Sequence, residues 1–382
     1  MPILYLDNAA TTQVRREVLE AMWPYLTGEF GNPSSVHTLG ERAATALTDA
    51  RSRVATVLGV RASDIVFTSG GTEADNLAIK GIALGDPRGR HIVTTAIEHE
   101  AVLESVDYLR RLHGFEVSYV PLTPDGTVTA EALEQVLRDD TTLVSVMYAN
   151  NEIGTIQDIA ALSALSRARG IRFHTDAVQA AGWLDLSIPT LGVDALSLSG
   201  HKIGAPKGIG AAYLRGRLPI EPLISGGGQE RTRRSGTENV AFAVGLATAL
   251  ELAEIERADA TRRVSTLRTD FLTRVCDLVP SAIITGHPSR RLPGHASFCF
   301  PGTSGEAVLL ELERRGVISS SGSACAAGSD EPSHVLTALG VSAEVAQTAV
   351  RFTFSTGITA EELEVAANAV AASVLALTDI RS

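Results

Sequence analysis

The fold of this chain is decided by the stretch RFHTDAVQAAGWLDLSIPTLGVDALSLSGHK, residues 172–202. It holds two strand-like apolar runs, at 172–175 and 195–198. Each run is followed at once by polar residues, Asp176 after the first and Ser199 to Lys202 after the second. In α/β proteins ligands bind beyond the carboxyl ends of parallel strands, so this stretch predicts both part of a sheet and part of a site.

Strand-like and helix-like segments alternate on both sides of this stretch, from about residue 40 to 215. Further strands are expected at 65–68, 92–95, 117–120 and 143–147, and helices at 74–84, 129–137 and 156–168. This alternation predicts an α/β domain with a mainly parallel sheet that helices cover on both faces.

Polar clusters follow the ends of successive predicted strands. Because parallel strands end at one edge of a sheet, we expect these clusters to form one site. They are Ser69–Glu73, Glu98–His99, Asn150–Glu152, Asp176 and Ser199–Lys202.

The pattern changes after a long charged helical stretch, 238–278, which is expected to lead out of the large domain. Strands then follow at 296–300 and 350–354, with helices at 305–315 and 360–377. We therefore predict a large domain at 15–255, and a smaller α+β domain made of 1–14 and 256–382.

Composition narrows the functional class of the 382-residue chain. Its formal net charge of -11 opposes a general nucleic-acid-binding role. Three cysteines, Cys276, Cys299 and Cys325, are too few for a disulfide framework or a zinc site, which suits a reducing compartment. No signal peptide or membrane span is evident, so a cytoplasmic protein that does not enter a membrane is expected.

Lys202 and Asp176 form the pair that a pyridoxal phosphate enzyme needs. The lysine would hold the aldehyde as a Schiff base, and the aspartate would keep the ring nitrogen protonated. Gln179 could donate to the phenolic oxygen. The alternatives are a solvated surface lysine and a helix N-cap at Asp176.

Phosphate would be held by Ser69–Glu73, where Gly71 allows close backbone approach, a helix begins, and Thr72 adds a hydroxyl. An ordinary tight turn is the alternative reading. Ser199 and His201 could assist. His99 could stack on the cofactor ring and move protons, or it could be a solvent-facing loop residue.

Arg351 sits in the apolar run VRFTF, residues 350–354, and needs a partner. A substrate carboxylate or a structural ion pair would serve. Cys325 lies in the small, polar, Gly-rich segment 319–330, which is expected to be mobile. A thiol there favours a reactive nucleophile, whereas Cys276 and Cys299 fit the buried state that is usual for free cysteine.

Together these residues resemble the cysteine desulfurases, fold-type I pyridoxal phosphate enzymes of the class V aminotransferase group. The resemblance covers nearly the whole chain. It is carried by residues 6–12 (LDNAATT), 30–35 (FGNPSS), 150–154 (NNEIG), 199–202 (SGHK), 234–237 (RSGT) and 320–325 (SSGSAC).

The resemblance implies a seven-stranded-type sheet, a homodimer, and conversion of L-cysteine to L-alanine with sulfur transferred to Cys325 as a persulfide for an acceptor protein. Cys325, Lys202 and His99 would be catalytic, and Asn150 and Arg351 would hold the substrate carboxylate. The cofactor would be held by Gly71, Thr72, His99, Asn150, Asp176, Gln179, Ser199, His201, Lys202 and, from the other subunit, Thr237. No resident metal is implied, although Cys325 could ligate an iron–sulfur cluster transiently.

The resemblance leaves the pathway open. The Cys325 loop, reaching 331–334, is similar to the longer kind that passes sulfur directly to partners. The chain stops soon after the last helix, whereas iron–sulfur assembly members carry a longer tail that docks a scaffold. The absence of such a tail puts that partner in doubt, so that tRNA thiolation, nitrogenase cluster supply and DNA phosphorothioate modification stand open beside iron–sulfur assembly. A selenocysteine lyase and a non-catalytic sulfur carrier are the alternatives.

Overall fold

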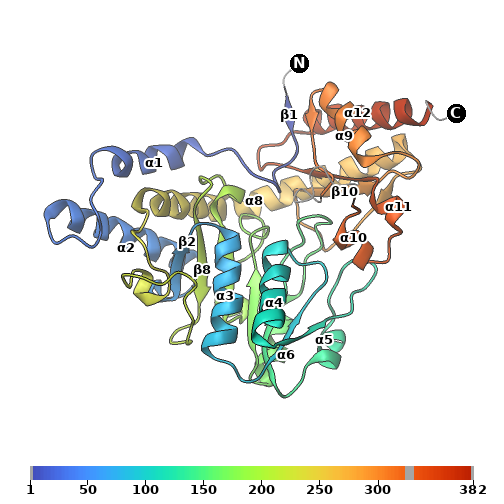
Figure 1. Ribbon diagram of the computed structural model, residues 1–382. Helices are drawn as coiled ribbons and strands as arrows, with labels where there is room; N and C mark the ends of the chain where they lie inside the picture. The colour runs from blue at the N-terminus through green and yellow to red at the C-terminus, as the bar shows by residue number, and fades with distance from the viewer. Residues whose placement is uncertain (1–2, 323–330, 380–382) are drawn as a thin grey trace.

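The computed structural model describes residues 3–322 and 331–379, and its largest element is a seven-stranded sheet of order β2-β8-β7-β6-β5-β3-β4 (Figure 1). Neighbouring strands are parallel except at β8, which runs antiparallel to both β2 and β7. The strands are β2 (Ile65–Thr68), β3 (His91–Thr94), β4 (Glu116–Tyr119), β5 (Thr141–Ser145), β6 (Arg172–Asp176), β7 (Ala195–Ser199) and β8 (Gly210–Leu214). The expected mainly parallel α/β sheet is confirmed.

Helices cover both faces of this sheet. Successive strand residues point to opposite sides, and because apolar residues occur on both sides, each face needs a covering layer. Val66 and Ile92 pack beneath α3 and α4, whereas Phe67 and Val93 belong to the core under α2 and α8. Figure 1 shows α3 and α4 lying side by side on one face. The helices of this part are α1 (Arg16–Thr27), α2 (Thr38–Leu58), α3 (Gly71–Gly85), α4 (Glu100–His113), α5 (Ala130–Val136), α6 (Ile159–Ala168), α7 (Ile188–Leu191) and α8 (Val240–Leu278), with 3-10 turns at η1 (Ala62–Asp64), η2 (Gly200–Lys202) and η3 (Glu230–Thr232).

A second, smaller layer of strands and helices lies at the far end of α8 (Figure 1). Its antiparallel sheet has the order β12-β10-β9, and β1 pairs in parallel with β11. The elements are β1 (Leu4–Tyr5), β9 (Ile283–Ile284), β10 (His295–Cys299), α9 (Gly305–Arg314), β11 (Val317–Ile318), α10 (His334–Ala338), α11 (Ala343–Ala346), β12 (Ala349–Thr353) and α12 (Ala360–Asp379). This is the α+β arrangement expected from the sequence.

The helix α8 is 39 residues long and contributes to two separate hydrophobic cores. Its residues up to Ala253 pack in the core of the large sheet, and those from Val264 onward pack in the second core. There Phe271 meets Phe352 edge to face, with ring centroids 5.4 Å apart. The N-terminal segment reaches this second core through the fully buried Leu6.

Apolar side chains also join the two parts at the edge of the large sheet. Ile97, Met147 and Ile153 from the large part pack with Val335 and Ala349 from the smaller part. This contact holds the loops that follow β3 and β5 against the segment around α10. Within the described ranges, no helix combines the length and apolar character needed to cross a membrane.

Candidate active site

The start of α3 is pressed against the ends of β6 and β7. A Cβ atom placed on Gly71 would lie 2.8 Å from Cγ2 of Val178 and 3.4 Å from Cβ of Ser199, so only glycine fits without displacement. The N-cap residue, Gly70, provides no side-chain cap. The structure therefore brings Gly71 and Ser199 together, at a helix N-terminus whose first amides are suited to an anion.

Asp176 ends β6 and is buried beside this point. Its Oδ1 accepts a hydrogen bond from the backbone N of Val178 at 2.9 Å. Burial raises the pKa of the Asp176 carboxyl, and the nearby His99 and Lys202 act to lower it, so both side chains lie close enough to influence this carboxyl. A buried carboxylate needs a positive partner. The nitrogen of a protonated pyridine ring would supply one, which fits the expected cofactor.

Lys202 lies in the 3-10 turn η2, directly after β7. Its Nζ donates to the carbonyl oxygens of Ala9 and Ala10, the second at 2.8 Å. Gln179 Nε2 donates to the same Ala9 oxygen at 3.1 Å, and His201 Nδ1 lies 3.1 Å from Thr11 Oγ1. The N-terminal segment 9–12 thus closes over the lysine. We noted this LDNAATT run only as part of the resemblance, and no role for it was expected.

His99 is half-buried and caps the N-terminus of α4, where its Nδ1 accepts from the backbone N of Ala101 at 3.0 Å. With Nδ1 accepting, a neutral His99 carries its proton on Nε2. His201 is different, because burial and nearby Lys202 lower its pKa to about 4. Near neutral pH His201 is therefore an uncharged hydrogen-bonding group.

Asn150 holds a tight turn together. Its Nδ2 donates to the carbonyl oxygen of Ile97 at 2.8 Å, and its Oδ1 accepts from the backbone N of Glu152 and Ile153 at 2.8 and 2.9 Å. The side chain is fully buried. This turn-forming role was not expected from the sequence, and its contacts with cofactor and substrate stay predictions.

Arg351 is buried in β12 and has the structural partner that we considered as one alternative. Its Nη2 donates to Asp7 Oδ1 at 2.7 Å, and its Nη1 donates to the carbonyl oxygens of Asn151 and Gly322 at 2.9 and 3.3 Å. Its Nε is buried without a hydrogen-bond partner among the described groups. The guanidinium therefore lies directly beneath the start of the segment that carries Cys325.

Three other predicted site residues lie at the surface or beyond the described ranges. Thr72 and Thr237 are exposed. The loop that carries Thr237 is tied to the start of α3 by an ion pair, in which Arg234 Nε lies 2.8 Å from Glu73 Oε1. Cys325 lies outside the residues that the structure describes.

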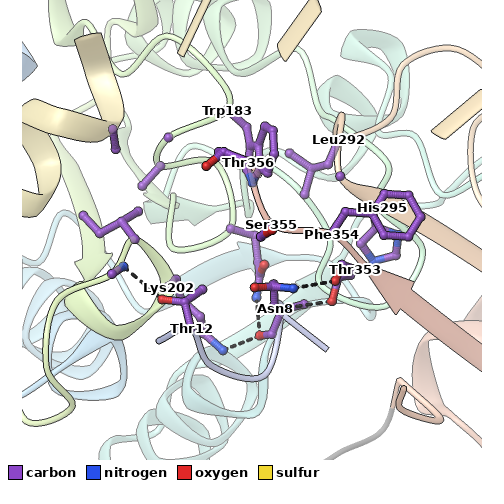
Figure 2. Close-up of a pocket in the computed structure, with 18 of the residues that line it drawn as sticks. Asn8, Thr12, Trp183, Lys202, Leu292, His295, Thr353, Phe354, Ser355 and Thr356 are labelled. Atoms are coloured by element: carbon purple, nitrogen blue, oxygen red, sulfur yellow. Dashed lines mark hydrogen bonds between the residues drawn. The ribbon is translucent and has the colours of Figure 1, made fainter. Parts of the chain in front are cut away.

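A cavity of about 310 Å³ opens beside Lys202 and Gln179 (Figure 2). Figure 2 shows Asn8 and Thr12 along one side of it and Trp183, Phe354 and Thr356 along the other. Of the predicted site residues within the described ranges, only Lys202 and Gln179 line it. Its volume is in the usual range for small-molecule pockets.

Comparison with known proteins agrees with this geometry. The model of the aminotransferase class-V family matches residues 4–365. The cysteine desulfurase IscS of Dictyoglomus turgidum is 46% identical over 361 residues, which covers 94% of this chain and 91% of that protein. The cysteine desulfurase IscS of Methanosarcina thermophila is also 46% identical, over 362 residues, 94% of this chain and 89% of that protein.

Solved structures agree as well. A NifS-like protein superposes with a TM-score of 0.90 at 39% identity, covering 97% of this chain and 98% of that one. A structure of SspA in complex with cysteine superposes with a TM-score of 0.81 at 36% identity, covering 92% and 98%. The residues at the strand ends suit the pyridoxal phosphate on which this group of enzymes depends, and the function is that of a cysteine desulfurase. With a family match over 4–365, the chain belongs to the class-V aminotransferases.

Proposed function

We propose that this cysteine desulfurase transfers the sulfur of L-cysteine to Cys325 as a persulfide and releases L-alanine. The observation that carries the proposal is the meeting of Lys202, Asp176 and the N-terminus of α3 at the ends of β6 and β7. A lysine amine, a carboxylate and an anion-binding helix start are the three groups that hold the aldehyde, ring nitrogen and phosphate of pyridoxal phosphate.

The proposed contacts with the cofactor follow from the chemistry of each residue. When bound, the cofactor supplies an electron sink that lets negative charge develop on substrate carbon. Asp176 would hold the ring nitrogen, Gln179 the phenolic oxygen, and His99 the ring face. The phosphate would be held by Gly71, Thr72, Ser199 and His201.

The chain's own groups carry the proton and sulfur steps. Nζ of Lys202 takes the proton from the substrate α-carbon and later returns one. The Cys325 thiolate attacks the substrate sulfur, so that an S–S bond forms as the C–S bond breaks. The electron pair of the broken bond stays on the substrate carbon, which takes up a proton to give alanine. The carbon is reduced as the sulfur is oxidised, and no external oxidant is needed.

The described residues on either side of the Cys325 segment support its assignment. Gly322 accepts from Arg351, and Ser333 Oγ donates to Glu152 Oε2 at 2.5 Å. His334 Nε2 lies 3.1 Å from the carbonyl oxygen of Glu98, next to His99. Both ends of the segment therefore reach the edge of the predicted site. Arg351 and Asn150, which lies next to Glu152 in the same turn, remain our proposed ligands for the substrate carboxylate.

We also infer a homodimer, in which Thr237 reaches the phosphate of the partner subunit. Thr237 is exposed, and so are the apolar side chains of Leu19, Trp23 and Leu26 on one face of α1. A sulfur-acceptor protein completes the cycle. We place the enzyme in the cytoplasm, because three cysteines in 382 residues suit a reducing compartment.

The decisive experiment maps the covalent link and the sulfur separately. Borohydride reduction of the yellow holoenzyme should fix the cofactor on Lys202. Lys202→Ala should lose this adduct and nearly all alanine formation, and Lys207→Ala, an exposed lysine in the same loop, should lose neither. Cys325→Ser should keep the colour and lose the persulfide, and Cys276→Ser should keep both. Mapping of the adduct to another amine, or an undiminished persulfide in Cys325→Ser, would overturn the proposal.

A further inference from the structure

Beneath the predicted cofactor site, a cluster of buried polar side chains separates α3 from the sheet. Asp75 lies on α3 one turn after Gly71 and is 1% exposed. It faces His174 on β6, whose ring is fully buried. Asp176 lies two residues further along β6 and on the same face, since strand side chains alternate. The cluster thus touches the strand that carries the proposed partner of the ring nitrogen.

The hydroxyls of two serines bridge this cluster. His174 Nδ1 lies 2.9 Å from Ser145 Oγ, and His174 Nε2 lies 3.0 Å from Ser197 Oγ. Ser197 is the strand partner of Asp176 in the pairing of β6 with β7. The Ser197 side chain also bonds to the Asp75 carboxyl. Ser197 therefore connects Asp75 and His174 directly beside Asp176.

The histidine does not balance the charge of the carboxylates. Burial lowers the pKa of His174 to about 3, so the ring is neutral near pH 7. Its Nε2 lies 3.6 Å from Asp75 Oδ1, beyond a hydrogen bond, and Asp75 Oδ1 has no partner among the described residues. An ionised carboxylate oxygen without a hydrogen-bond partner would cost much more free energy in this position than the carbonyl oxygen of a neutral carboxyl.

Other titratable groups near Asp75 add negative rather than positive charge. Burial and the charges of Asp176 and Glu98 raise the pKa of Asp75, and burial raises the pKa of Glu98 to about 8. The groups that act on Asp75 are Asp176 and His174 from β6, Ser197 from β7 and Glu98 from the loop after β3, while Ser145 from β5 contacts the far side of the His174 ring. Three ionised carboxylates could not share this dry space.

We propose that Asp75 is a positioning residue that stays a neutral, protonated carboxylic acid and so keeps the negative charge of the buried cluster on Asp176. Through Ser197 it also fixes the neutral tautomer of His174. If Asp75 donates to Ser197 Oγ, Ser197 donates to His174 Nε2, and His174 Nδ1–H donates to Ser145 Oγ, then the protons of Asp75, Ser197 and His174 each have an acceptor. The inference rests on the proposed cofactor role of Asp176.

Infrared spectroscopy of the holoenzyme labelled with 13C-aspartate tests the protonation directly. The carbonyl stretch of a protonated carboxyl should be shifted by the label, and this signal should vanish in Asp75→Asn. Glu98→Gln should leave the labelled signal in place, as should Asp139→Asn at an exposed position. A wild-type spectrum without a labelled acid signal near pH 7 would overturn the proposal, even if the enzyme is a desulfurase.

The dissociation constant for pyridoxal phosphate distinguishes a positioning role of Asp75 from a loss of structure caused by its replacement. Asp75→Asn keeps the shape and the neutral charge, so its dissociation constant for pyridoxal phosphate should stay within about threefold of wild type. Asp75→Ala leaves Ser197 and His174 without the carboxyl of residue 75. It should bind pyridoxal phosphate on the order of tenfold more weakly than wild type does. If Asp75→Asn binds pyridoxal phosphate as weakly as Asp75→Ala does, Asp75 is not a neutral acid in the wild-type enzyme. Asp176→Asn removes the ionised group, and unchanged binding of pyridoxal phosphate in that variant would instead refute the proposed cofactor role of Asp176.

Discussion

At the scale of single residues, burial affects the protonation of Glu98 more strongly than hydrogen bonding does. Glu98 is fully buried, and its carboxylate accepts from Thr95 Oγ1 at 2.7 Å and from the backbone N of Met147 at 3.0 and 3.1 Å. These bonds favour the charged form, but burial outweighs them and raises the pKa of Glu98 to about 8.

This shift predicts how stability depends on pH. Between about 4.5 and about 8 the folded chain keeps a proton on Glu98 that the unfolded chain releases, so the free energy of unfolding falls as the pH rises through this window. His174, with a pKa of about 3, acts in the opposite direction below about 6.5. Glu98→Gln should therefore be more stable than wild type at pH 8, by at most roughly 5 kcal/mol, and similar to it at pH 4.5.

Chemical denaturation of the two proteins across this pH range measures the difference directly, and the contribution of His174 cancels in the comparison. Glu313→Gln, at an exposed position of α9, is the control and should show no such trend. Equal stabilities of wild type and Glu98→Gln at pH 8 would show that Glu98 is not protonated in the fold.

At the scale of elements, the position of α3 determines where its N-terminal amides lie, and these amides are our proposed phosphate ligands. The helix begins at Gly71, against Val178 and Ser199, and Asp75 lies on its inner face. The same helix therefore carries both the amides that would bind the phosphate in the proposed site and a carboxyl of the cluster beneath Asp176. A shift of its first turn would disturb both.

Gly71→Ala should produce such a shift. The new Cβ would lie 2.8 Å from Cγ2 of Val178, and overlaps of this kind cost about 1 to 3 kcal/mol. The affinity for pyridoxal phosphate should fall on the order of tenfold, as measured by titration of the apoenzyme. Val178→Ala removes the clashing methyl groups, so the double variant should regain most of the affinity. Full affinity in Gly71→Ala alone would contradict the close packing.

At the scale of the whole molecule, α8 connects two cores that are otherwise built from different parts of the chain. Its first half packs under the large sheet and its second half against α12 and β10. We propose on this basis the division expected from the sequence, with 15–255 as one domain and 1–14 joined to 256–382 as the other. Segment 9–12 crosses this division to reach Lys202, so the site depends on both parts.

The exposed apolar face of α1 leads to a prediction about assembly. Leu19, Trp23 and Leu26 are 52%, 66% and 54% exposed, and apolar faces of this kind mark interfaces. Sedimentation should show a dimer for wild type. Trp23→Glu combined with Leu26→Glu should shift it toward monomer, with a loss of cofactor affinity because Thr237 would no longer reach its partner. Leu310→Glu, an exposed leucine of α9, should stay dimeric. A wild-type monomer would overturn the inferred assembly.

Much of the fold follows from local patterns. The strands at 172–176 and 195–199 and the helix at 240–278 lie close to their expected positions, because apolar runs between polar ends are readable in sequence. Strand β8 was missed, since its residues GAAYL are mostly small and make a weak apolar run. The helices α1 and α2 lie before the first predicted strand and were not identified either.

The sequence predicted only part of the site. Lys202 and Asp176 stood out because each follows a strand end. Asp75 and Glu98 did not stand out as parts of a buried network, because an acidic residue in a helix or loop is usually solvated. The pairing of Arg351 with Asp7 joins residues 344 positions apart, and no local pattern shows such a contact.

The sequence alone determined the α/β class, the residues at the strand ends and the family resemblance, because these depend on periodicity and on spacing along the chain. Only the tertiary structure decided that residues 9–12 cover Lys202, that Asn150 and Arg351 make internal bonds, and that Asp75 is buried beside His174 and Asp176. Protonation and partner choice depend on which groups exclude water from one another, and that is a property of the packed molecule.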